Sequence, residues 1–336
     1  MARIALDAMG GDNAPHAPVA GALEALAELD TRHRIQLVGQ TPVIERALAE
    51  LKNGAARSVH ERIDVVEAPD VIEMTDKPTD VRKKPNSSMS VGLKLQAEGK
   101  SDGFVSAGNT GAQMAASLFA LRLHEGLTRP AIATLFPTAK QAVVVLDSGA
   151  NVDCSAEELV QFARLGVVYA EDVLGRVNPS VGLLSIGEEP EKGNAVVKEA
   201  NQLLSQAGLN FQGNVEGRDI PLGESDRGPI DVVVCDGFVG NVLLKFYESV
   251  APMIMTLAGG ALSLDKARMG EAFKSLDYSE HGGAPLLGVK GVSIICHGRS
   301  SPRAIKNALK KAVQAADSDM DAHIGRRLAA AAEIKA

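Results

Sequence analysis

Short apolar runs alternate with segments of helical periodicity from the first residues of the chain onward. The segments 3–6, 35–38 and 63–66 are short and mainly apolar, which predicts strands. Between the first two runs, residues 17–29 carry leucines at helical spacing. This alternation of strand and helix predicts an α/β fold with a parallel, doubly wound sheet.

The alternation continues through the rest of the chain. The apolar runs 103–105, 181–186 and 232–235 predict further buried strands, each followed by a glycine-bearing turn and a helix. The segments 131–135 and 142–146 lie close together in sequence and predict an antiparallel pair. We expect one α/β domain over residues 1–336, without internal repeats.

Residues 67–88 interrupt the rhythm. They contain three prolines and charges of both signs, which is typical of a long functional loop or lid. The cluster Arg82-Lys83-Lys84 either contacts a ligand or forms a solvated charged face.

Two of the predicted strand-to-helix turns contain a Gly-Asn pair. Residues 231–245 pass from a buried run through an Asp-Gly turn to a helix that begins near Asn241, and residues 103–112 do the same around Asn109. The first N–H groups of a helix and its dipole favour an anion. Two such turns predict two anionic groups at the carboxyl edge of one sheet; the alternative is two ordinary turns.

Two further strand-end loops carry polar residues. Lys192 stands beside three glutamates just before a predicted helix, where a cation is electrostatically misplaced unless it faces a bound anion. Asp147 and Asn151 follow the run 142–146 and either line the same crevice or form an Asx turn.

Composition excludes several classes of function. The 336 residues carry a net charge of −7 and only 3% aromatic residues without Trp, which disfavours nucleic-acid binding. Three distant cysteines and seven scattered histidines form no metal or disulfide pattern, so we expect no metal and no cofactor. The N-terminus has no signal-peptide pattern, and no apolar run is long enough to span a bilayer, so we expect a cytoplasmic protein.

The chemistry that remains is transfer between bound groups. No phosphate-binding P-loop, dinucleotide fingerprint, zincin motif or hydrolase nucleophile elbow occurs. Gly, Asn, Ser and Asp at strand ends, with a lysine, can bind a small anion and a carbonyl oxygen. This fits acyl or phosphoryl transfer in which the protein positions the reactants and stabilises an oxyanion.

At this level of detail the chain resembles the bacterial acyl-ACP:phosphate acyltransferases of phospholipid synthesis. The resemblance covers about residues 3–320 and rests on several motifs in the same order. These motifs are residues 7–12, 106–112, 147–151, 187–194, 213–219, 236–241 and 282–288.

The resemblance implies a three-layer α/β/α fold similar to phosphotransacetylases and isopropylmalate dehydrogenases, with a helical tip at 249–280. It implies a homodimer in which inorganic phosphate attacks the thioester of a fatty acyl chain on acyl carrier protein. The acyl phosphate would then serve a membrane glycerol-3-phosphate acyltransferase on the way to phosphatidic acid. The apolar part of the tip either packs in the core or dimer, or contacts the inner face of the membrane.

The resemblance also implies roles for individual residues. Lys192 balances the charge of phosphate or the oxyanion, Asn241 donates to the thioester oxygen or phosphate, and Asp219 orients the attacking phosphate or accepts its proton. Asn109, Thr110 and Gly111 hold a second anionic group, phosphate or the pantetheine phosphodiester. The full set of implied substrate-binding residues is Ser106, Gly108, Asn109, Thr110, Gly111, Asp147, Asn151, Gly193, Asn194, Asp236, Gly237 and Gly240.

Because carrier protein is acidic, a basic patch is expected on this acidic chain. Arg303, Lys306, Lys310 and Lys311 share one predicted helix and are the candidates, with a solvated face as the alternative. Two other functions stay open: a phosphotransacetylase-like transferase that uses acyl-CoA, and a non-catalytic scaffold that recruits lipid-synthesis enzymes to the membrane.

Overall fold

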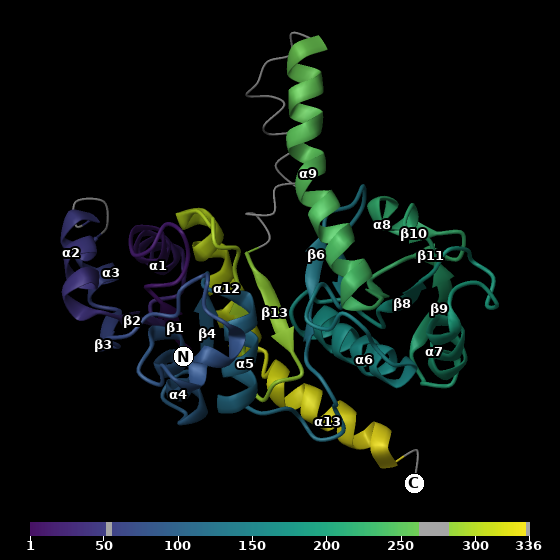
Figure 1. Cartoon of the computed structure of the whole chain (residues 1–336), viewed down its shortest axis with the longest axis horizontal. Helices are drawn as coiled ribbons and strands as arrows, with labels where there is room; N and C mark the ends of the chain where they lie inside the picture. The colour runs from purple at the N-terminus through teal and green to yellow at the C-terminus, as the bar shows by residue number, and fades with distance from the viewer. Residues whose placement is uncertain (52–55, 262–281, 334–336) are drawn as a thin grey trace. The chain divides into compact units, whose positions relative to one another are not determined.

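The computed structural model describes residues 1–51, 56–261 and 282–333. By contact density the chain divides into two compact units, Met1–Glu125 with His281–Gly325 and Gly126–Glu280 with Arg326–Ala336. Each unit contains a largely parallel sheet covered by helices (Figure 1), which confirms the predicted α/β class. Each of the two units has its own main sheet.

The first unit is built on parallel strands that run in the order β3-β2-β1-β4-β14, with β13 antiparallel to β14. The predicted runs 3–6, 35–38 and 63–66 are the first three strands. The strands are β1 (Arg3–Asp7), β2 (Arg34–Gly39), β3 (Ile63–Glu67), β4 (Gly103–Ser106), β13 (Ala284–Leu287) and β14 (Ser293–Ile295).

Helices cover both faces of this sheet (Figure 1). Helices α1 and α12 pack side by side on one face, and α4 and α5 lie on the other. The helices are α1 (His16–Glu28), α2 (Thr41–Leu51), α3 (Arg57–His60), the 3-10 helix η2 (Pro78–Arg82), α4 (Ser88–Ala97), α5 (Thr110–Ala120) and α12 (Pro302–Asp317).

The second unit contains a sheet in the order β6-β7-β12-β8-β9. Its last four strands are parallel, and β6 pairs antiparallel with β7, which confirms the predicted antiparallel pair. The strands of this sheet are β6 (Thr134–Phe136), β7 (Val143–Leu146), β8 (Ser180–Leu184), β9 (Asn210–Val215) and β12 (Val232–Val234). Outside this sheet the unit also contains the short strand β5 (Ala131–Ile132) and the hairpin of β10 (Glu224–Ser225) and β11 (Gly228–Pro229).

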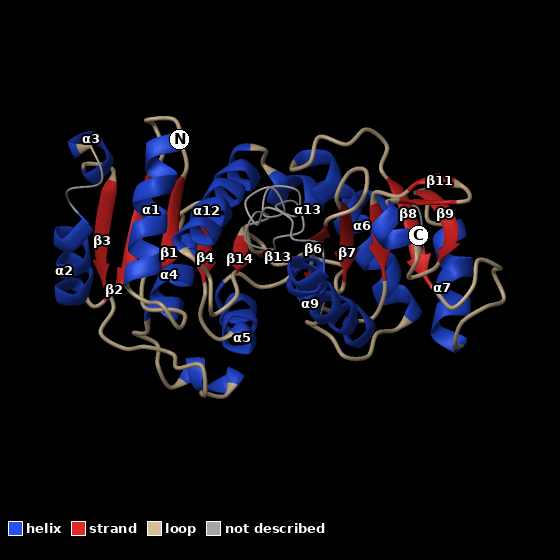
Figure 2. Cartoon of the chain, turned by 90° about the horizontal axis from the view of Figure 1, so that it is seen from above, coloured by secondary structure: helices blue, strands red, loops and turns tan. Residues whose placement is uncertain are grey.

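Helices α6 and α7 lie on one face of this sheet and α9 on the other (Figures 1 and 2). On the α9 face, Leu243, Leu244 and Tyr247 pack against a buried cluster that includes Phe136 and Val233. The helices are α6 (Ala156–Asp172), α7 (Ala195–Ser205), α8 (Asp219–Leu222) and α9 (Gly237–Ala261), and α13 (Met320–Glu333) ends the described chain.

The predicted helical tip 249–280 is only partly covered by the structure. Residues 249–261 continue α9 without a break, whereas residues 262–281 lie outside the described part of the chain. Among the helices that are described, none combines the length and hydropathy of a membrane span.

Candidate functional site

Four neighbouring parallel strands of the second unit end at one edge of their sheet. β7 ends before Asp147, β12 before the Asp236 turn, β8 before the Lys192 loop and β9 before Asp219. Because the carboxyl ends of parallel strands meet at one edge, the structure brings these four predicted loops to the same side of one sheet (Figure 2).

The carboxylate of Asp147 organises its own loop. It is fully buried, and its Oδ1 accepts from the N–H groups of Ile132 at 2.9 Å and Ala150 at 3.1 Å. Its Oδ2 accepts from the N–H of Asn151 at 2.6 Å and from the Asn151 Nδ2 at 3.0 Å. Burial raises the pKa of Asp147, and these hydrogen bonds oppose that shift. Asp147 therefore holds the loop in place, as the Asx-turn alternative had it.

Asn151 is also committed to local structure. Its Nδ2 donates to the carbonyl oxygen of Pro130 at 2.8 Å as well as to Asp147, so both amide hydrogens are engaged. Its carbonyl oxygen accepts from the N–H of Gly237 at 2.8 Å. A Cβ at Gly237 would lie 2.4 Å from that oxygen, so the start of α9 approaches this loop more closely than a larger residue allows.

The N–H groups at the start of α9 are mostly occupied. Besides that of Gly237, the N–H of Val239 donates to Asp236 Oδ1 at 2.8 Å and the N–H of Gly240 to the Asp236 carbonyl at 3.0 Å. Asn241 lies exposed against Gly149, and its side-chain amide makes no hydrogen bond within the described residues. At this helix start, the hydrogen-bond donor that stays available is therefore the side-chain amide of Asn241, since most of the backbone N–H groups already have partners.

Lys192 lies in the turn between β8 and α7. Its N–H donates to the carbonyl oxygen of Glu189 at 3.0 Å, while its Nζ forms no ion pair or hydrogen bond within the described ranges. The side chain is exposed. The next two residues shape the turn: Gly193 has φ +103°, and Asn194 caps α7 by accepting from the N–H of Val197 at 2.9 Å.

Asp219 is buried, and its Oδ2 accepts from the N–H of Glu216 at 2.8 Å. Beside it, Arg218 contacts Glu216 at 2.9 Å and Glu188 at 3.1 Å, so this arginine links the β9 loop to the Lys192 loop. Sequence reasoning assigned Arg218 no role, although it stands inside one of the matched motifs.

The first unit has a strand-end arrangement of its own. The Asn109 turn follows β4 and the Asn241 turn follows β12, which belong to different sheets, so the prediction that both turns lie at the edge of one sheet is wrong. Asp7 ends β1 and Ser106 ends the neighbouring β4, and the Ser106 Oγ donates to Asp7 Oδ2 at 2.7 Å. The Ser106 Oγ also accepts from the N–H of Gly108 at 2.9 Å. Burial raises the pKa of Asp7. Ser106 and Gly108 thus hold two loops together at this edge.

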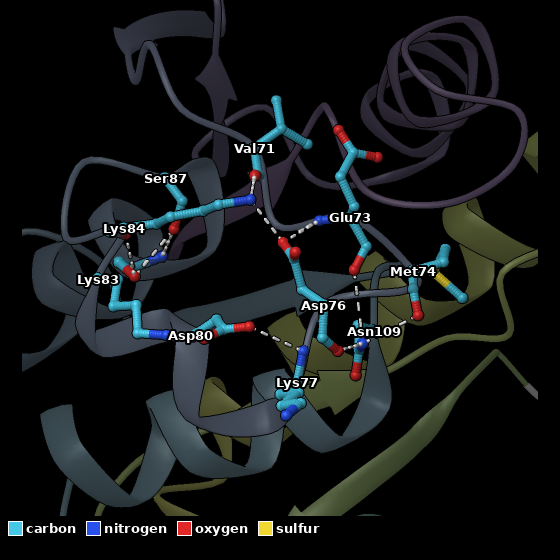
Figure 3. A network of polar contacts seen from close by, with 11 residues as sticks. Val71, Glu73, Met74, Asp76, Lys77, Asp80, Lys83, Lys84, Ser87 and Asn109 are labelled. Atoms are coloured by element: carbon cyan, nitrogen blue, oxygen red, sulfur yellow. Dashed lines mark hydrogen bonds and ion pairs between the residues drawn. The ribbon is translucent and has the colours of Figure 1, made fainter.

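Asn109 caps α5 and anchors the long loop 67–88 (Figure 3). Its Oδ1 accepts from the N–H of Ala112 at 3.0 Å, and its Nδ2 donates to the carbonyl oxygens of Asp76 at 2.8 Å and Met74 at 3.1 Å. These contacts use the amide hydrogens of Asn109, so within the described residues its side chain holds the loop in place.

The same loop is closed by Lys84, whose Nζ contacts Asp76 at 2.6 Å and the carbonyl oxygen of Val71 at 3.0 Å (Figure 3). The hydrogen bond to Asp76 raises the pKa of Lys84. Arg82 stacks over the ring of Phe119 at 4.2 Å. Lys83 bonds to Asp80 at 2.8 Å, so all three basic residues at 82–84 have a partner inside the unit, although Arg82 and Lys83 remain exposed.

The predicted basic patch on α12 is smaller than expected. Lys311 is not part of it, because its side chain is only 9% exposed and its Nζ donates to the carbonyl oxygen of Gly283 at 2.8 Å. Lys306 and Lys310 are accessible but share Glu28 at 2.8 and 2.7 Å. Arg303 is exposed on the first turn of the same helix.

Most of the polar residues at the two sheet edges form hydrogen bonds within their own loops or with neighbouring loops. No group of three or more potential metal ligands gathers within the described residues. In the second unit the carboxylates and capping amides hold the loops, whereas Lys192 and Asn241 keep unused donors. An ammonium group and a primary amide at one sheet edge can bind an anion and a carbonyl oxygen.

Comparison with known proteins agrees with the sequence motifs. The family model described as "Fatty acid synthesis protein" matches residues 2–323. The chain is 49% identical over 333 residues to a phosphate acyltransferase of Heliobacterium modesticaldum, covering 96% of each chain. It is 48% identical over 330 residues to a phosphate acyltransferase of Desulforamulus reducens, covering 95% of each.

The chain belongs to the fatty acid synthesis protein family. This confirms the resemblance that the motifs predicted. Among solved structures, this family member matches a phosphotransacetylase of Streptococcus pyogenes with a TM-score of 0.63 at 17% identity, over 94% of each chain. It matches the EutD phosphotransacetylase of Staphylococcus aureus with a TM-score of 0.62 at 16% identity, also over 94% of each. At these identities the likeness confirms the phosphotransacetylase-like fold and nothing further.

Proposed function

We propose that this protein transfers an acyl group from a thioester donor to inorganic phosphate and releases an acyl phosphate. The observation that carries the proposal is a difference between the polar groups at the carboxyl edge of the second unit's sheet. There Lys192 and Asn241 retain free donors within the described structure, while the surrounding carboxylates are bound into the loops. Membership of a family whose relatives are named phosphate acyltransferase supports the same reaction.

The reaction needs no covalent enzyme intermediate. A phosphate oxygen attacks the thioester carbonyl carbon and forms the new O–C bond, while the carbonyl oxygen gains negative charge. The tetrahedral intermediate collapses, the C–S bond breaks, and the thiolate leaves and takes up a proton. A site for this step needs cationic or amide donors that hold phosphate and stabilise the oxyanion.

The chain supplies these groups in the second unit. Lys192 balances the charge of phosphate or the oxyanion, and Asn241 donates to the thioester oxygen or to phosphate. Asp219 orients the attacking phosphate through the loop that it closes. The remaining predicted residues, Asp147, Asn151, Gly193, Asn194, Asp236, Gly237 and Gly240, shape the loops around these three.

In this proposal the first unit binds the second anionic group. The N–H groups of Thr110 and Gly111 open helix α5. In our proposal they hold phosphate or the phosphodiester of a pantetheine arm, while Ser106, Gly108 and Asn109 fix the turn beneath them.

The donor that we propose is a fatty acyl chain on acyl carrier protein. Arg303, Lys306 and Lys310 form an accessible basic row on α12, which fits an acidic protein partner. The acyl phosphate would supply a membrane glycerol-3-phosphate acyltransferase in the formation of phosphatidic acid. We further propose a cytoplasmic homodimer that contacts the inner membrane surface through the region 249–280.

The test is mass detection of acyl phosphate after mixing purified protein, inorganic phosphate and long-chain acyl carrier protein. Acyl-CoA in place of the carrier thioester forms the second arm. We expect phosphate-dependent product with the carrier donor and much less with CoA. Equal use of both donors would favour a phosphotransacetylase-like enzyme, and binding of donor without thioester loss would favour a scaffold.

A further inference from the structure

The turn that presents Lys192 is held from below by a buried pair of amide side chains. Asn214 lies on β9 and is only 2% exposed, and its Nδ2 donates to the carbonyl oxygen of Glu189 at 2.7 Å. The same carbonyl oxygen accepts from the N–H of Lys192 at 3.0 Å. One carbonyl group therefore joins a buried side chain to the backbone of the exposed lysine.

A second amide completes the chain of contacts. Asn201, on helix α7, is also buried, and its Nδ2 donates to Asn214 Oδ1 at 2.9 Å. The direction of this relay follows from the carbonyl of Glu189, which can only accept. Asn214 must point its nitrogen at Glu189, so its oxygen faces Asn201.

A β-bulge places Asn214 where it can do this. In the pairing of β8 with β9, Val181 faces Phe211 but Gly182 faces Gly213, so one extra residue of β9 is inserted. After the bulge, Val215 belongs to the cluster packed under α9, and Asn214 therefore points to the opposite face, where α7 carries Asn201. A one-residue shift without the bulge would exchange the two faces.

We propose that Asn201 and Asn214 are positioning residues for Lys192, which act by fixing the Glu189 carbonyl on which the lysine turn closes. The inference rests on the proposed function for the role of Lys192, but the contacts exist independently of it. Within the described part of the chain, the side chains of Asn201 and Asn214 make no hydrogen bonds other than these, and the arrangement explains why two amides are buried between β9 and α7. If the turn moves, the ammonium group moves with it, and a displacement of about 1 Å can lower turnover roughly a hundredfold.

The first test is a double-mutant cycle with Asn214→Ala and Lys192→Ala. We expect Asn214→Ala to lower kcat roughly tenfold to a hundredfold, with little change in KM for the acyl donor. In the Lys192→Ala background the same change should have almost no further effect, because its target is already absent. If Asn214→Ala lowers kcat in the Lys192→Ala protein by the same factor as in the unsubstituted protein, the proposal is overturned.

Further variants grade the effect. Asn214→Asp should be at least as harmful as Asn214→Ala, because it places a carboxylate against the Glu189 carbonyl. Asn201→Ala should be milder, because the contact from Asn214 to Glu189 remains. Asn210→Ala is the matched control: Asn210 lies at the other end of β9 and donates to the carbonyl oxygen of Asn178 at 3.0 Å. We expect near-normal kinetics from the control, and an equal loss there would contradict the proposal.

Amide hydrogen exchange tests the relay without any activity. In Asn214→Ala the N–H of Lys192 should exchange roughly tenfold faster than in the unsubstituted protein, while the amides of β12 keep their protection. Unchanged exchange at Lys192 would overturn the positioning role, whatever the activity of the variant. If the unsubstituted protein forms no acyl phosphate, the proposed function fails, and this measurement still decides the relay.

Discussion

Gly240 in helix α9 packs directly on the backbone of Asp147, so that a Cβ at position 240 would come within 1.9 Å of the Asp147 carbonyl oxygen. The obstacle is backbone and cannot rotate away. The contact joins the helix that carries Asn241 to the loop organised by the buried aspartate, and it sets how far the helix start can approach the sheet.

Gly240→Ala should therefore shift α9 away from the Asp147 loop. We expect the free energy of unfolding to fall by about 1–3 kcal/mol, as in other overpacked sites. Turnover should fall as well, because Asn241 moves with the helix. Chemical denaturation and the acyl-phosphate assay measure the two effects. Gly217→Ala is the control, since a Cβ there meets nothing within 4 Å; equal destabilisation by both changes would contradict this account.

Lys192→Ala should impair the reaction without harming the fold. The side chain is exposed and unpaired within the described residues, so thermal stability should be nearly unchanged. Loss of one donor that stabilises an oxyanion costs roughly 10²–10³ in kcat. Lys198→Ala, an exposed lysine on the neighbouring helix α7, is the control in steady-state kinetics. Near-normal turnover in folded Lys192→Ala would exclude the lysine from the mechanism, and Asn241→Ala applies the same test to the amide.

Lys311 should make stability depend on pH in the alkaline range. Burial lowers its pKa from 10.5 to about 8, so between these values the unfolded chain binds the proton and the folded protein does not. Stability then rises with pH from about 8 towards 10.5, by roughly 3 kcal/mol over the full window. Lys311→Met should remove this rise. Urea unfolding at pH 7, 8, 9 and 10 gives the free energy of unfolding of both proteins. The same dependence on pH in both would refute the lowered pKa of Lys311.

Glu28 masks the basic row of α12, and its removal should strengthen binding of an acidic donor. Lys306 and Lys310 both bond to Glu28 and lower its pKa to about 2, so it is ionised at neutral pH. Glu28→Gln should lower KM for acyl carrier protein and steepen its dependence on salt, whereas Lys306→Glu with Lys310→Glu should raise KM. Lys94→Glu, an exposed lysine on α4, is the control. If none of these variants changes KM for acyl carrier protein, the carrier does not bind at this row of basic residues.

The far part of α9 should contribute to membrane contact. Met253 is 51% exposed, and Ile254 follows it on the same helix. If this region lies in the interface, Met253→Asp with Ile254→Asp should reduce co-sedimentation with anionic vesicles. Val177→Asp, at another exposed apolar position, should leave partitioning unchanged. Equal partitioning of all three proteins would remove the membrane role.

Local sequence determined a large part of this protein. Short, mainly apolar segments predict the strands because their pattern is a property of a few neighbouring residues. The capping box of Ser155 and Glu158 is likewise a pattern of four neighbouring residues, and in the structure the N–H of Ser155 donates to Glu158 Oε2 at 2.9 Å. Residues that follow parallel strands must lie at one edge, so the placement of Lys192 and Asn241 on the same side of a sheet also follows from the sequence.

Tertiary structure decided which of these side chains are free. Asn109, Asp147 and Asn151 look like ligand groups in sequence, but each finds partners that only the folded chain brings within reach. Lys311 meets the Gly283 carbonyl 28 residues away and leaves the surface, and Asn201 meets Asn214 across 13 residues and a β-bulge. Pairing over such separations depends on how elements pack, and a pattern read along the chain contains no information on that packing.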